Sequence, residues 1–86
     1  MPVLAKFRGI IIRMFRVRGM RARFHATCGD AEVIIEIAPL RVVQGDMPAA
    51  LTQLVLTWAR LHQGELLGAW RAVLESRRPA AIGPLN

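Results

Sequence analysis

Hydrophobic and polar residues alternate on both sides of Gly29-Asp30, across the stretch from residue 21 to residue 37. Alternation with a period of two is typical of a half-buried strand, and a Gly-Asp pair suits the two-residue turn of a hairpin. This turn places Phe24 opposite Ile35, so that one face of the hairpin is wholly apolar. The other face carries three further cross-strand pairs: Thr27 with Glu32, His25 with Ile34 and Arg23 with Glu36.

A preceding strand is predicted over residues 7–17, where Ile12 and Arg13 fall on opposite faces. A loop at residues 18–20 places Arg13 opposite His25 and keeps Ile12 on the apolar face. A register that put the arginine into the core would leave an unpaired charge there, which is costly. We therefore predict an outer sheet face that binds a partner or ligand through these residues: Arg13, Phe15, Arg21, Arg23, His25 and Glu36.

The second half of the chain has helical spacing. A short strand at residues 40–43 precedes a turn, Asp46 can cap a helix, and Pro48 fits the first turn of that helix. Gly64 is expected to separate it from a second helix that ends before Pro79. Each helix has an apolar stripe that we assign to the core: Leu51, Leu54, Val55, Trp58 and Leu61 in the first, and Leu66, Leu67, Trp70, Val73 and Leu74 in the second.

These elements predict one α+β domain over residues 1–86. An antiparallel sheet of three to four strands occupies residues 1–45, and two helices within residues 46–78 pack on its apolar face. Residues 79–86 form a tail. The opposite face of the sheet is left bare, and it is the predicted binding surface.

Positive charge is concentrated at the start of the chain. The net charge is +6, but residues 1–25 hold Lys6 and six arginines without an acid, whereas residues 26–86 hold five arginines against six acids. A local positive field attracts phosphates or an acidic partner. No apolar run approaches the roughly 18 to 20 residues of a membrane helix, and the start has no export pattern. We expect a cytoplasmic protein with no membrane contact.

His25 is the weak candidate for a catalytic residue. One histidine cannot supply the three or four ligands of a zinc site, and Cys28 is the only cysteine, so we predict no metal site and no cofactor. Catalysis would need a nucleophile or a second acid-base group, and this face offers little beyond Thr27, Arg13 and two glutamates. The residues favour binding over catalysis and leave enzyme activity open.

Two residues of the outer face bear directly on binding. Arg23 opposite Glu36 predicts an exposed ion pair worth less than about 1 kcal/mol. Phe15 stands among arginines, where its ring could stack on a base or anchor a protein partner. A nucleic acid would use this ring together with the arginines of the same region: Arg13, Arg16, Arg18, Arg21 and Arg23.

Several segments, taken in order, resemble a bacterial family. They are KFRGIIIRMF at residues 6–15, FHA at 24–26, Gly29, LVLTWARLH at 54–62, ELLGAW at 65–70 and IGPL at 82–85. Together they resemble the small proteins of the domain-of-unknown-function family numbered 4160. Members are often encoded beside a small protein of a second family, numbered 2442, in pairs that look like toxin–antitoxin modules. The resemblance therefore implies a small, neighbour-encoded protein partner.

The chain departs from the family pattern at one stretch. Members usually carry Pro-Pro-His-Phe-His-Ala before the hairpin turn, where this chain has RARFHA at residues 21–26. The second histidine of that pattern matches His25, but Arg23 replaces the first. Ala69 stands where an asparagine often precedes the tryptophan. A site that needs both histidines would be incomplete here.

Three functions follow as expectations. The first is a non-enzymatic, protein-binding component of a two-protein, toxin–antitoxin-like module, acting through the open sheet face or a strand edge, with self-association as a close variant. The alternative is nucleic-acid binding by the N-terminal arginines. The third is a nuclease-like toxin that uses His25 with Arg13 and Arg23.

Overall fold

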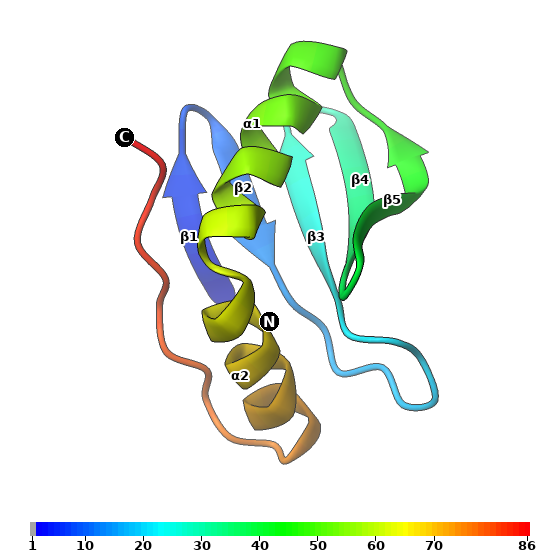
Figure 1. The fold of residues 1–86 in the computed structure, drawn as a ribbon, viewed down its shortest axis with the longest axis vertical. Helices are drawn as coiled ribbons and strands as arrows, with labels where there is room; N and C mark the ends of the chain where they lie inside the picture. Colours follow the sequence, from blue (N-terminus) through cyan, green and yellow to red (C-terminus); the bar gives the residue numbers. More distant parts are fainter. Residues whose placement is uncertain (1) are drawn as a thin grey trace.

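The computed structural model describes residues 2–86 and shows an antiparallel sheet with two helices on one face (Figure 1). The five strands lie side by side in chain order. They are β1 (Val3–Phe7), β2 (Ile10–Arg13), β3 (Arg23–Cys28), β4 (Ala31–Ile37) and β5 (Leu40–Asp46), followed by α1 (Ala49–Leu61) and α2 (Gln63–Leu74). The predicted α+β class is confirmed, but the sheet has five strands instead of three to four.

The extra strand is β1, which shares only Phe7 with the single strand that we predicted over residues 7–17. A turn at Arg8 and Gly9 separates β1 from β2, and both residues have positive φ, 49° and 78° respectively. An arginine rarely adopts this conformation, so the sequence shows no ordinary turn signal there besides the glycine. β2 then ends at Arg13, and residues 14–22 form a long connection in place of the short predicted loop.

The central strands have the predicted register. β3 and β4 pair from Arg23 with Glu36 through to Cys28 with Ala31, around the turn at Gly29. β2 joins them with Arg13 opposite His25. Because the side chains of a strand alternate between faces, this register confirms which residues of these strands face the core and which face outward.

The helices cover the inner face of the sheet. Phe24, Ile35 and Trp58 are completely buried between the two layers, and the rings of Phe24 and Trp58 meet edge to face with 5.9 Å between their centroids. Trp70 is also buried, so the assignment of both tryptophans to the core is confirmed, whereas Leu61, at the end of α1, is 69% exposed and its assignment to the core was wrong. Among residues 2–86, neither helix has the length and apolar character needed to cross a membrane.

The helix boundaries differ from the predicted ones in two ways. Asp46 is the last residue of β5, and Pro48 occupies the N-cap position of α1 without a side-chain hydrogen bond, so the predicted aspartate cap was wrong. The break between the helices falls at His62, whereas Gly64 lies in the first turn of α2. A glycine near a helix end was therefore mistaken for the break itself.

The C-terminal tail lies along β1, at one edge of the sheet (Figure 1). The amide of Ile82 donates a hydrogen bond of 2.8 Å to the carbonyl oxygen of Leu4, and the indole Nε1 of Trp58 donates one of 2.7 Å to the carbonyl oxygen of Gly83. These bonds hold the tail against the body of the domain, and the side chain of Ile82 is buried. β5 forms the other edge of the sheet, and within residues 2–86 no further strand pairs with it there.

Candidate binding surface

The outer face of the sheet is the candidate binding surface. α1 and α2 both lie on the opposite side, and no helix or strand of residues 2–86 is layered over it (Figure 1). The strand registers place these side chains on it: Val3, Lys6, Ile11, Arg13, Arg23, His25, Thr27, Glu32, Ile34, Glu36, Arg41, Gln44 and Asp46. We use "outer face" for this set together with Phe15.

Four apolar side chains lie among the polar ones of the outer face. Val3 is 40% exposed, while Ile11, Phe15 and Ile34 are partly exposed. The ring of Phe15 meets the imidazole of His25 edge to face, with 4.4 Å between the ring centroids. Phe15 follows the end of β2, so it has no cross-strand partner in the β2–β3 pairing. Exposed apolar side chains framed by charges are typical of a protein-binding surface.

His25 is held between two neighbours. Its Nδ1 lies 3.0 Å from Oε2 of Glu32, and its other contact is the ring of Phe15. The Thr27 hydroxyl points toward the carbonyl oxygen of Ile11 at 3.5 Å and accepts a contact of the same length from Arg13. The geometry thus orients an imidazole, but it aims no nucleophile at it.

Glu36 is the centre of a partly buried ion cluster. Its Oε2 lies 3.2 Å from Nη2 of Arg23, and its Oε1 accepts a hydrogen bond of 2.8 Å from Nε of Arg41. The side chains of Arg23 and Glu36 are only 14% and 6% exposed, so the prediction of an exposed ion pair was wrong. Arg23 also donates from Nε to the carbonyl oxygen of Arg21.

The cluster changes the acidity of Glu36. The hydrogen bond from Arg41 holds the pKa of this carboxyl below its usual value of 4.5; burial acts in the opposite direction, and the positive charges of the nearby arginines add to the lowering. Glu36 and Arg23 are therefore parts of the folded scaffold. The sequence analysis missed Arg41, because it did not pair the short strand at residues 40–43 with the preceding strand; counted from Ile37 opposite Leu40, the register places Arg41 directly opposite Glu36.

The N-terminal arginines divide into two groups. Arg13 and Arg23 lie on the outer face, whereas Arg16, Arg18 and Arg21 lie in the connection between β2 and β3. That connection meets the end of α2, where Nη1 of Arg16 donates a hydrogen bond of 3.0 Å to the Ser76 hydroxyl. An open cavity of about 650 Å³ lies at this junction, and Arg77 and Arg78 line it as well. The alternation of apolar and polar residues in the sequence did not indicate that Arg77 and Arg78 would line the same cavity as Arg16.

The remaining chemistry of the surface is limited. Among residues 2–86, no group of three or more His, Cys, Asp and Glu side chains is placed to hold a metal ion.

Comparison with known proteins gives one match: the model of a family described as "Domain of unknown function (DUF4160)" matches residues 9–71. No curated protein and no solved structure matches the chain.

Proposed function

The chain belongs to the DUF4160 family, and we propose that it is a non-enzymatic binding protein that engages a second small protein through its outer face. The observation that carries this proposal is a set of partly exposed apolar side chains on that face, Val3, Ile11, Phe15 and Ile34, which stand among polar side chains such as Arg13, His25 and Thr27. Exposed apolar residues inside a charged frame are what a protein partner buries on association.

The charges of the outer face favour a protein over a nucleic acid there. Lys6 and Arg13 lie on β1 and β2, whereas Glu32 and Asp46 lie opposite each other on β4 and β5. A phosphate backbone would be repelled by the acidic half. A partner protein with an apolar patch can place its own charges in the reverse order, and such complementarity gives specificity and correct orientation.

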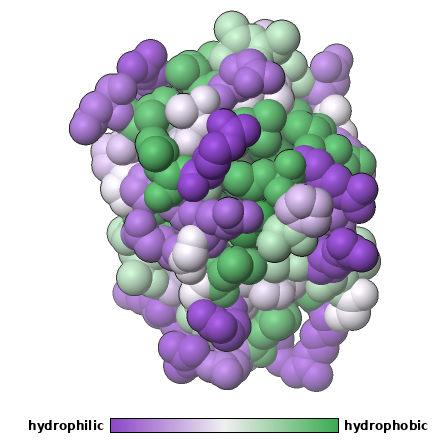
Figure 2. All heavy atoms as spheres, in the orientation of Figure 1, coloured by the Kyte–Doolittle hydropathy of each residue, from purple (hydrophilic) through white to green (hydrophobic). Residues whose placement is uncertain are grey.

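The free edge at β5 is the less suitable docking region. Hydrophobic surface gathers between α1 and β5 on the helix side of the molecule (Figure 2), and Val42 and Val43 are exposed. However, the register of β5 shifts opposite Ile34 and Ile35, and Gly45 has a φ of 93°. An irregular edge is a poor template for an added strand. We therefore assign docking to the outer face.

The biological setting that we propose is a two-protein module of the toxin–antitoxin kind, with the genomic neighbour as the partner. The support is the family membership together with a surface suited to one small protein. The test is to co-express the chain with its neighbour and to measure molar mass by light scattering after size-exclusion chromatography. A complex at micromolar concentration is expected, and two independent monomers would refute the proposal.

Paired variants locate the contact. Ile11→Lys with Ile34→Lys should weaken the complex at least about tenfold, because two charges would enter an apolar interface. The matched control is Val42→Lys with Val43→Lys at the β5 edge, which should leave affinity unchanged. Circular dichroism confirms that each variant folds. If the edge variant is the one that loses binding, docking takes place at β5 and the outer face is not the site.

Two further measurements separate the alternatives. Sedimentation of the chain alone detects self-association, and a dimer that the partner cannot displace would contradict a two-protein module. Incubation with labelled RNA and DNA detects cleavage. Turnover that His25→Ala abolishes, with the fold intact, would replace the binding proposal by the nuclease-like one.

A further inference from the structure

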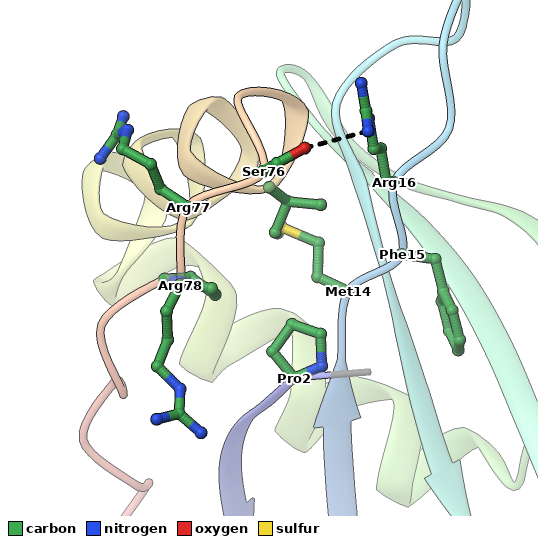
Figure 3. A pocket seen from close by; sticks show the side chains of 9 residues that line it. Pro2, Met14, Phe15, Arg16, Ser76, Arg77 and Arg78 are labelled. Atoms are coloured by element: carbon green, nitrogen blue, oxygen red, sulfur yellow. Dashed lines mark hydrogen bonds between the residues drawn. The ribbon is translucent and has the colours of Figure 1, made fainter.

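The open cavity at the end of α2 has a basic rim. It lies where the connection of residues 14–22 meets the C-terminal segment that follows α2, at the lower end of the molecule in Figure 1 (close view in Figure 3). The residues that line it are Pro2, Met14, Phe15, Arg16, Val73, Ser76, Arg77, Arg78 and Pro79. Met14 and Val73 give it an apolar floor, and three guanidinium groups surround that floor.

The way α2 ends explains why two arginines reach this rim. Ser76 adopts a φ of 58°, and the amide of Arg77 turns back to donate a hydrogen bond of 2.7 Å to the carbonyl oxygen of Ala72. This geometry closes the helix and redirects the chain. The bond from Arg16 to the Ser76 hydroxyl then joins the two basic segments, although they are far apart in sequence.

Positive charge is dense at this end of the molecule. We use "basic end" for the three arginines that line the cavity, Arg16, Arg77 and Arg78, together with Arg18 and Arg21, which belong to the same connection as Arg16. Residues 14–22 contain no acid, and the nearby Glu75 forms an ion pair with Arg77. Every cation of the set is an arginine, the residue favoured for phosphate and nucleic-acid recognition.

The directions of the side chains indicate the shape of the ligand. In Figure 3, the guanidinium groups of Arg16, Arg77 and Arg78 point in different directions around the floor. They do not converge on one point, so they do not form a pocket for a single phosphate. Separated cations on a common rim suit an extended polyanion, whose charges are also separated.

From this geometry we propose that the basic end binds the sugar–phosphate backbone of a nucleic acid, at a site separate from the outer face. The ring of Phe15 is directed away from Met14 and the cavity (Figure 3), and no other aromatic residue lines it, so no stacked base is expected. Binding is therefore insensitive to base sequence. Release of condensed counterions supplies the driving force, which an acidic protein surface does not offer to the same extent.

The proposed site differs from the nucleic-acid site expected from the sequence. Arg23 is engaged by Glu36 and by the carbonyl oxygen of Arg21, and Phe15 packs on His25. We therefore do not include either residue in the proposed site. Arg77 and Arg78 take their places, because the fold brings the end of α2 to the β2–β3 connection.

Fluorescence anisotropy with a labelled oligouridine and a labelled short DNA duplex tests the proposal. About four phosphate contacts predict a slope of about −3.6 for log affinity against log salt concentration with the duplex. Arg18→Gln with Arg78→Gln should reduce the magnitude of that slope by about 1.8, since two contacts are lost. These two positions spare Arg16, whose bond to Ser76 stabilises the cavity.

The matched control removes the same charge elsewhere. Arg8 lies in the β1–β2 turn at the opposite end of the sheet, and Arg60 is exposed on α1. Arg8→Gln with Arg60→Gln should keep the slope of the unchanged protein. An equal loss in both double variants, or no binding at low salt, would overturn the proposal.

Polyglutamate serves as a competitor matched in charge. It should displace the labelled oligonucleotides only at a far higher concentration of charges than unlabelled RNA needs. Equal displacement would overturn the proposal in favour of an acidic protein ligand. Loss of partner binding by the outer-face variants leaves these results unchanged, so each proposal can fail alone.

Discussion

The two faces of the sheet are made from alternating residues of the same strands, yet they are stabilised differently. On the inner face, Phe24 is completely buried against Trp58. On the outer face, its neighbour His25 contacts the ring of Phe15 and the carboxylate of Glu32, and remains partly exposed. The inner face is held by packing against helices, whereas the outer face is held by pairwise polar and ring contacts, which leaves it available for a partner.

The largest expected difference between the faces comes from removing one side chain on each. Phe24→Ala should lower the free energy of unfolding by about 3–5 kcal/mol, because it leaves a cavity in the core of a small domain. Ile34→Ala on the outer face should cost about 1 kcal/mol, since that side chain is only partly buried. Urea denaturation of both variants makes the comparison. Equal costs would mean that something covers the outer face as well.

The alternation that separates Phe24 from His25 was sufficient to predict the central part of the fold. Gly29-Asp30 set a register that the structure reproduces pair for pair. Arg8 could not be recognised as a turn residue, because a positive φ for arginine is set by the surrounding fold and has no local signal. Residues of β2 and β3 were therefore placed correctly while β1 was missed.

The candidate site was predictable to the same extent. Arg23, His25 and Glu36 were placed on the correct face by counting along β3 and β4. The burial of Glu36 was not predicted, because Arg41 also binds this carboxylate and the strand that carries Arg41 was not paired with β4 in the sequence analysis. Contacts between distant segments, such as Arg16 with Ser76, have no periodic pattern at all.

Replacing Gly45 tests whether the ion cluster around Glu36 depends on the close approach of β5 to β4. A Cβ atom on Gly45 would lie 2.2 Å from the carbonyl oxygen of Glu32, and the residue has a φ of 93°. Gly45→Ala should therefore cost about 2–3 kcal/mol from backbone strain and steric overlap. Gly19→Ala is the control, since Gly19 has a φ of 77° but no atom within 4 Å. If both cost the same, strain alone acts and the close approach is unimportant.

The tail supports the inner face through one side-chain hydrogen bond. Trp58→Phe removes the Nε1 donor of the bond to Gly83 and keeps most of the ring packing. A loss of about 1–2 kcal/mol is expected, which is the cost of one buried hydrogen bond. Hydrogen exchange at the Ile82 amide, which bonds to Leu4, should speed up. Trp70→Phe should leave that exchange unchanged, and equal acceleration in both variants would show a general loosening.

The smallest expected effect, and one that depends on pH, concerns Glu36. Because its pKa is below 4.5 in the folded protein, mainly through the bond from Arg41, the ionised form is favoured by folding. This contribution is complete above the pKa of the unfolded chain. It is lost as the pH falls through the lower, folded-state pKa. Glu36→Gln should therefore be less stable than the unchanged protein near neutral pH, and the difference should shrink in acid.

A substitution of Arg41 tests which arginine is responsible for the lowered pKa of Glu36. Arg41→Gln removes the largest cause of the lowered pKa of Glu36 and leaves Arg23 in place, so acid unfolding should begin at a higher pH than in the unchanged protein. Urea denaturation at a series of pH values between neutral and acid measures this shift. An unchanged pH dependence of unfolding in acid would mean that Arg21 and Arg23 are sufficient to hold Glu36 ionised. In that case the outer face is stabilised within the β3–β4 hairpin, without the help of β5.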